Sequence, residues 1–223
     1  MQHDYVSEID QRIAGKSLLQ HPFYQAWSKG ELSKEALSDY ARQYYHHVAA
    51  FPTYLSQVHA VTGDQPTRRM ILQNLIDEEA GTPNHPELWL MFAESLGVTI
   101  ESAKNAELYP ETQALIDSFR SECSKGTTEG LTALYCYESQ IPAVSESKIA
   151  GLKEFYGMSD PKGYAYFKVH IEADKEHSAV ERECLRSYIT ESNFLEATRS
   201  ADNTLNALYG ILDGVCKRNG IMC

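Results

Sequence analysis

The stretch SKEALSDYARQYYHHVAAFPTYLSQVHAVTG, residues 33–63, carries apolar side chains at helical spacing over its whole length. Ser33 is a favoured N-cap residue at its start, and Gly63 closes it. Pro52 lies inside the stretch, and we expect it to kink the helix rather than end it. One helix of this length predicts a helical protein.

The rest of the chain repeats this pattern. Helical spacing runs through residues 4–19, 23–27, 66–81, 86–97, 110–124, 127–157, 161–190 and 192–218. The alternation of a half-buried sheet is missing, the loops are short, and no linker separates two halves. We therefore expect one all-α domain over residues 1–223, a compact bundle of seven to nine helices.

The excess of acidic residues over basic ones limits the kinds of partner that we expect the chain to bind. Lys and Arg number 20 against 31 Asp and Glu, which gives a net charge of −11. This charge repels phosphate backbones and anionic lipid, so we expect no nucleic-acid and no membrane partner. Residues 1–20 lack the pattern of a signal peptide, and no apolar run is long enough to cross a bilayer. The sequence predicts a cytoplasmic protein.

The five cysteines are scattered, odd in number and without a C-x-x-C pair. This pattern predicts free, buried thiols rather than a disulfide framework or a structural zinc site.

One segment brings imidazoles and a carboxylate to a single helix face. In YFKVHIEADKEHSAVEREC, residues 166–184, the side chains of His170, Asp174 and His177 stand at i, i+4 and i+7. With about 3.6 residues per turn, these positions share one face and can converge on one point. Glu181 continues the same face and is a weaker candidate.

Two further segments supply acids and a third imidazole. In NLIDEEAGTPNHPELW, residues 74–89, Glu78 and Glu79 end a helix, and His85 follows a tight turn. In LTALYCYESQIPAV, residues 131–144, Glu138 lies in an apolar run where an unpaired carboxylate is costly to bury.

The candidate ligands are three carboxylates and three imidazoles from three helical regions. They are Glu78, His85, Glu138, His170, Asp174 and His177. Oxygen and imidazole ligands without thiolate suit iron or manganese, and helix bundles hold pairs of such metals between facing helices. In the alternative interpretation, Glu78 and Glu79 face solvent and Glu138 pairs with a Lys or Arg.

Tyrosines are unusually frequent, with 14 in the chain. Tyr135 and Tyr137 lie beside Glu138, and Tyr164 and Tyr166 precede the first imidazole of the third segment. Aromatic residues at helical spacing are more often core residues than parts of a reactive site.

Five stretches together resemble one known family: HPFYQAWSKGELSKE, YYHHVAAFPTYLS, DEEAGTPNHPELW, YESQIP and GYAYFKVHIEADKEH. By these motifs the chain resembles the chlamydial protein associating with death domains (CADD) and its bacterial relatives. That group belongs to the haem-oxygenase-like dimetal oxidases, near the pyrroloquinoline-quinone biosynthesis protein C (PqqC) and the TenA thiaminases. The resemblance covers residues 18–190 and implies a haem-oxygenase-like helical bundle.

The resemblance also implies an activity. The family is implicated in making para-aminobenzoate, which supplies the aromatic ring of folate, by a route that bypasses the usual chorismate enzymes. The family's ligand motif falls on the six candidate ligands above. The ring would come from the protein's own Tyr24 and the amino group from its own Lys148, with Tyr137 and Tyr166 as further tyrosines near the metals. Such an oxygenase would turn over once. It would require two divalent ions (Fe/Fe or Mn/Fe), O2 and an external reductant from an unknown electron donor, and we expect a homodimer.

Two other functions stay open from the sequence. One is a dimetal oxidase that acts repeatedly on an external small molecule, as PqqC-like proteins do. The other is a non-catalytic interaction protein whose metal site is structural, although no basic or apolar recognition stripe supports such binding.

Overall fold

Helices form the framework of residues 4–223, the part of the chain that the structure, a computed structural model, describes. In chain order they are α1 (Tyr5–Gly15), α2 (Pro22–Ser28), α3 (Lys34–Val61), α4 (Gln65–Glu79), α5 (His85–Ser95), α6 (Ile100–Lys104), α7 (Pro110–Lys125), α8 (Thr127–Glu138), α9 (Ile141–Glu154), α10 (Ala165–Tyr188) and α11 (Phe194–Arg218). Two short 3-10 helices, η1 (Leu18–Gln20) and η2 (Pro161–Tyr164), complete the set. The expected all-α fold is confirmed.

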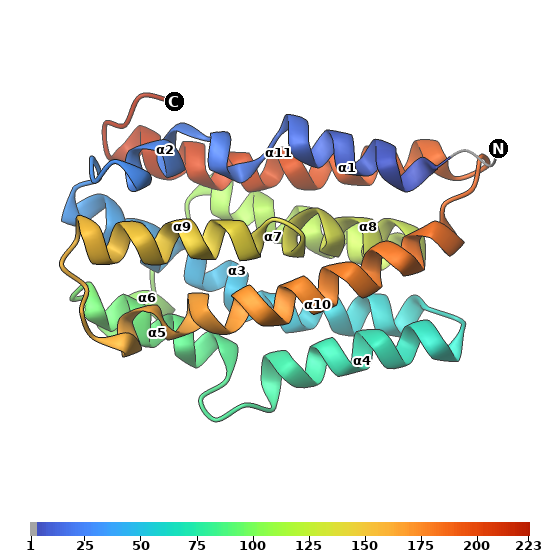
Figure 1. Ribbon diagram of the computed structural model, residues 1–223, viewed down its shortest axis with the longest axis horizontal. Coiled ribbons are helices and arrows are strands. Elements are labelled where there is room, and N and C mark those ends of the chain that lie inside the picture. Colours follow the sequence, from blue (N-terminus) through green and yellow to red (C-terminus); the bar gives the residue numbers. More distant parts are fainter. Residues whose placement is uncertain (1–3) are drawn as a thin grey trace.

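The core is built around α3, the helix that the opening stretch predicts. Ser33 caps it by accepting a hydrogen bond from the backbone N–H of Ala36, and Pro52 lies inside it without ending it. Its side chains are buried along most of its length because α4, α5, α7 and α8 pack against it. Figure 1 shows the long helices side by side, with α1 and α11 along one edge and α4 along the opposite edge.

Two local features raise the number of helices above the expected seven to nine. The short helix α6 forms where Thr99 accepts a hydrogen bond from the backbone N–H of Ser102. The segment over 127–157, which helical spacing presents as one run, is divided into α8 and α9. Pro142, at the start of α9, has no N–H to donate, and its ring collides with the carbonyl four residues earlier, so the helix ends there instead of bending.

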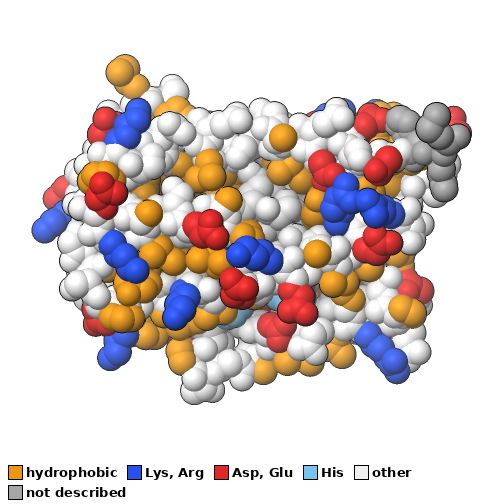
Figure 2. Space-filling view, viewed as in Figure 1, with side chains coloured by type: hydrophobic (Ala, Val, Ile, Leu, Met, Phe, Trp, Pro, Cys, Tyr) orange, Lys and Arg blue, Asp and Glu red, His pale blue; other side chains and the backbone are white. Residues whose placement is uncertain are grey.

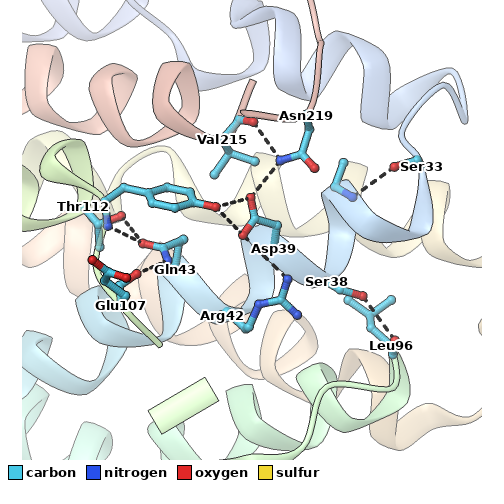
Figure 3. A network of polar contacts seen from close by, with 12 residues as sticks. Ser33, Ser38, Asp39, Arg42, Gln43, Leu96, Glu107, Thr112, Val215 and Asn219 are labelled. Atoms are coloured by element: carbon cyan, nitrogen blue, oxygen red, sulfur yellow. Dashed lines mark hydrogen bonds and ion pairs between the residues drawn. The ribbon is translucent and has the colours of Figure 1, made fainter. Parts of the chain in front are cut away.

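A polar network fastens α3 to the end of α11 (Figure 3). Asp39 on α3 accepts hydrogen bonds from the hydroxyl of Tyr109, at 2.8 and 2.9 Å, and from the side-chain amide of Asn219, at 2.8 Å. Arg42 lies 3.7 Å from the same carboxylate. These contacts fix the central helix against the outer ones.

The cysteines differ in part from the expectation of free thiols. Cys123 and Cys136 are free and buried, and Cys184 is free, but Cys216 and Cys223 form a disulfide. The turn after α11 brings these two together over a separation of 7 residues, which spacing alone does not reveal. Within residues 4–223, no helix is both long enough and apolar enough to cross a membrane.

Candidate metal centre

The first group of candidate ligands joins three helices. Glu78 lies in the last turn of α4, His85 is the first residue of α5, and His170 lies on α10. Oε1 of Glu78 is 2.9 Å from Nδ1 of His85 and 3.7 Å from Nε2 of His170. All three side chains are buried, and one ligand atom from each lies within 4.8 Å of the others.

A capping box positions His85, the imidazole of the first group that follows the turn after α4. Asn84 accepts a hydrogen bond from the backbone N–H of Glu87, and the Glu87 side chain accepts one from the backbone N–H of Asn84. This reciprocal pair starts α5 at His85, directly after the turn that closes α4. The turn therefore returns His85 to within reach of Glu78.

The second group lies where α8 ends beside α10. Glu138 is the last residue of α8, and Asp174 and His177 follow one another around α10. Nδ1 of His177 is 3.6 Å from Oε1 of Glu138 and 3.7 Å from Oδ1 of Asp174. All six predicted ligands are thus present in the site, divided into two groups of three.

Neighbouring groups orient two of the imidazoles. Nδ1 of His170 lies 2.7 Å from the backbone carbonyl of Tyr166, so it carries the proton and leaves Nε2 facing Glu78. Nε2 of His177 lies 3.1 Å from Asp77, which leaves Nδ1 facing its own group. Metal-binding imidazoles are commonly held in this way by a carbonyl or a carboxylate. Figure 2 shows a little histidine surface near the boundary of α10 and α4, between acidic side chains.

In the site, burial and oppositely charged neighbours shift the pKa values of the ligands in opposite directions. Burial alone would raise the pKa of Glu78, but its two imidazole partners outweigh burial and lower that pKa to about 2. Burial alone would lower the pKa of His177, but Asp174 and Glu138 raise it to about 11. For Asp174, burial is the largest effect and raises the pKa to about 6. A divalent cation binds the same atoms in competition with protons, so metal binding would release them.

The site residues fit a pair of metal ions. Several of their polar atoms are buried without a hydrogen-bond partner among the described residues: Oε2 of Glu138, Oδ2 of Asp174 and Nδ1 of His177. Such atoms are costly to bury unless something binds them. A small cavity lined by members of both groups, and closed by Val48 and Phe51, lies between them. Imidazole and carboxylate donors without sulfur suit iron and manganese.

A third group of possible ligands lies elsewhere. The side chains of His21, Cys216 and Cys223 approach one another, but the two sulfurs are joined in the disulfide. His21 accepts a hydrogen bond from the backbone N–H of Phe23 and contacts Asp213. Its groups already have partners, so it does not compete with the centre described above.

Lys148 lies deep in the bundle on α9, with 3% of its surface exposed. Six aromatic ring centroids lie 4.9–5.8 Å from its Nζ: those of Tyr24, Trp27, Tyr40, Tyr44, Trp89 and Phe167. Nζ is 2.6 Å from the hydroxyl of Tyr40 and forms no ion pair with a carboxylate among the described residues. Burial lowers the pKa of Lys148 well below its usual value, which favours the neutral amine.

Tyr24 lies beside this amine. It is 2% exposed on α2, and its hydroxyl is 3.2 Å from the hydroxyl of Tyr40. Tyr40 therefore touches both Tyr24 and Lys148, which themselves lie 5.2 Å apart measured from Nζ to the ring centroid. The structure brings the two residues that the resemblance singled out into one dry aromatic pocket.

The other two predicted tyrosines connect this pocket with the ligand groups. The ring of Tyr166 packs at a tilt against that of His170, with ring centroids 4.0 Å apart. The hydroxyl of Tyr44 donates a hydrogen bond to that of Tyr137, at 3.1 Å, and the rings of Tyr44 and Tyr40 are 5.1 Å apart. A continuous line of tyrosines thus runs from the ligands to Tyr24.

Four residues of the site were not predicted from the sequence. Tyr40 and Tyr44 link the pocket to the ligands, Asn74 donates a hydrogen bond to Glu138 at 2.9 Å, and Asp77 orients an imidazole. Helical spacing could have indicated Asn74, because it lies one turn before the predicted ligand Glu78 on the same face of α4.

Comparison with known proteins places the chain among enzymes. Residues 38–209 match a family model described as an iron-containing redox enzyme. The chain is 44% identical to a 4-aminobenzoate synthase of Chlamydia pneumoniae over 93% of each protein. It is 42% identical to a 4-aminobenzoate synthase of Nitrosomonas europaea over 95% of this chain and 90% of that protein. A solved domain with a haem-oxygenase-like fold from Shewanella denitrificans superposes with a TM-score of 0.81 at 20% identity, over 95% of this chain and 92% of the other.

The helical bundle and its buried carboxylate and imidazole groups are those of an iron-containing redox enzyme with a haem-oxygenase-like fold. Within that class, identities above 40% over nearly the whole length decide the assignment. The chain belongs to the 4-aminobenzoate synthase family.

Proposed function

We propose that this protein makes 4-aminobenzoate once, from its own side chains, with the ring of Tyr24 and the amino nitrogen of Lys148. Its family membership supports 4-aminobenzoate as the product. The observation that supports the internal source is the buried pair itself, an amine and a phenol joined through the hydroxyl of Tyr40.

The amine is prepared for bond formation by its surroundings. A protonated lysine has no free electron pair, whereas burial among aromatic rings lowers the pKa of Lys148 and so favours the neutral, nucleophilic amine. The hydroxyl of Tyr40 fixes its direction, at 2.6 Å from Nζ. Water is excluded because the surrounding rings and both reacting side chains are buried.

The phenol is held at the same place. Because Tyr24 and Lys148 belong to one chain, their encounter needs no diffusion, and such positioning contributes about 7–11 kcal/mol in favourable cases. The hydrogen bond to Tyr40 fixes the Tyr24 hydroxyl. Tyr137 and Tyr166 lie between this pocket and the ligands and provide a contiguous aromatic connection.

The six carboxylate and imidazole residues would hold two divalent ions in this proposal, either Fe/Fe or Mn/Fe. When bound, such ions supply the capacity to activate O2 for oxidation. In this proposal the reaction also requires an external reductant from an unknown electron donor.

Tyr24→Phe tests the proposal directly. We expect this variant to retain both metals and to form no 4-aminobenzoate, because it lacks the phenol oxygen and the hydrogen bond to Tyr40. The protein would be loaded with Fe(II), alone or with Mn(II), and exposed to O2 and reductant. Released 4-aminobenzoate would be measured by mass spectrometry and bound metal by elemental analysis.

Tyr54→Phe provides a matched control. Tyr54 is also fully buried, and its hydroxyl has no hydrogen-bond partner. We expect this variant to form product as the wild type does. Undiminished product from Tyr24→Phe would refute the internal ring source.

A further inference from the structure

Glu181 is a buried acid on α10 that the six-ligand set leaves out. It is 1% exposed, and it lies one helical turn beyond His177 on the face that also carries Asp174. Its Oε2 is buried without a hydrogen-bond partner. A carboxylate in this position requires a cation or a proton to compensate its charge.

The neighbours of Glu181 are themselves acids. Its carboxyl group interacts with those of Glu138 and Asp174. The basic side chain next to it in sequence, Arg182, instead pairs with Asp10, with Nη2 2.6 Å from Oδ2. In the described part of the chain, no Lys or Arg forms an ion pair with any of these three buried acids.

We propose that Glu181 is a further ligand of the ion held by Glu138, Asp174 and His177. This inference rests on the proposed metal centre and extends it. With Glu181 the centre contains four carboxylates, whose charge balances two divalent ions, whereas the six-ligand set leaves one positive charge uncompensated. Four carboxylates also ligate the paired metals of other helical bundles.

The second group offers Glu181 a place as a ligand through its unpartnered carboxylate oxygens. Asn74 occupies Oε1 of Glu138 through a hydrogen bond of 2.9 Å, while Oε2 of Glu138 is buried and unpartnered. Oε2 of Glu181 and Oδ2 of Asp174 are unpartnered as well. Among the described residues, three carboxylate oxygens from two helices are therefore buried here without a hydrogen-bond partner.

Titration of the full-length, metal-free protein with Mn(II) tests the assignment. The spectrum of free Mn(II) would be followed by electron paramagnetic resonance for the wild type, Glu181→Gln and Glu183→Gln. Glu183 lies on the same helix but is exposed and paired with Arg186, so it serves as the matched control. We expect two ions in the wild type and in the control, and a second ion bound at least about tenfold more weakly in Glu181→Gln.

Thermal unfolding without metal separates a ligand from a structural acid. The amide of Glu181→Gln can donate to Glu138, so we expect the metal-free variant to melt no lower than the wild type and to gain less stability from Mn(II). Unchanged affinity for both ions in Glu181→Gln would overturn the inference and leave the proposed centre intact. A wild type that binds no Mn(II) and no Fe(II) would overturn the centre itself.

Discussion

At the scale of residues, the chemistry depends on two side chains whose neutral forms are favoured by burial. Burial raises the pKa of Tyr24 and lowers the pKa of Lys148, which favours a phenol that keeps its proton and an amine with a free electron pair. Burying a neutral amine costs far less than burying an ammonium ion without a counter-charge. Tyr40 then satisfies both groups through its hydroxyl.

The lowered pKa of Lys148 makes stability depend on pH. Between the lowered pKa of the folded protein and the unfolded value of about 10.4, the unfolded state binds more protons at this lysine, so the free energy of unfolding rises with pH there. Lys148→Met removes this effect. We expect the variant to be more stable than the wild type at pH 7 by more than about 1 kcal/mol, and the difference to shrink towards pH 10.

Urea unfolding at several pH values measures this difference. Lys168→Met replaces an exposed lysine on α10 and controls for the loss of a positive charge. We expect its effect on stability to be small at every pH. A stability difference for Lys148→Met that does not change with pH would show that Lys148 is charged in the folded protein.

At the scale of elements, the site depends on where helices stop. Glu78 and Glu138 both lie at helix ends, and His85 begins a helix. Helical spacing alone runs across the break after α8, where Pro142 interrupts the helix and Gln140 holds the chain at this end. Its side-chain amide donates to the carbonyl of Cys136 at 2.7 Å, and its side-chain oxygen accepts from the backbone N–H of Leu18 at 2.8 Å. Leu18 is 122 residues away in sequence, so no local pattern could reveal this contact.

The capping box before α5 gives a prediction at this scale. Asn84→Ala removes a cap worth about 1 kcal/mol and loosens the start of the helix at His85. We therefore expect both lower stability in urea and weaker Mn(II) binding by the group that contains His85.

Thr99→Ala is the matched control for this change. Thr99 caps α6, away from the ligands, through the backbone N–H of Ser102. We expect it to lower stability without changing Mn(II) affinity. Equal Mn(II) affinity in Asn84→Ala and the wild type would show that the turn does not position His85.

At the scale of the whole molecule, much of the fold follows from sequence, and the site follows in part. Apolar spacing and caps predicted the all-α class and most helix positions, because those signals are local. Spacing also assembled the six candidate ligands, because three lie on one helix face, Glu78 and His85 lie on either side of a marked turn, and Glu138 is an acid in an apolar run. The aromatic pocket could not be assembled in this way. Its members come from α2, α3, α5, α9 and α10, and only packing brings them together.

The mass of the intact protein before and after reaction tests the central claim most directly. Protein loaded with Fe(II), alone or with Mn(II), would be exposed to O2 and reductant, and released 4-aminobenzoate would be measured in the same sample. We predict a mass loss that peptide mapping localises to Tyr24 and Lys148, with no more than one product molecule per chain. An unchanged mass together with more than one product molecule per chain would contradict the account and indicate an external substrate.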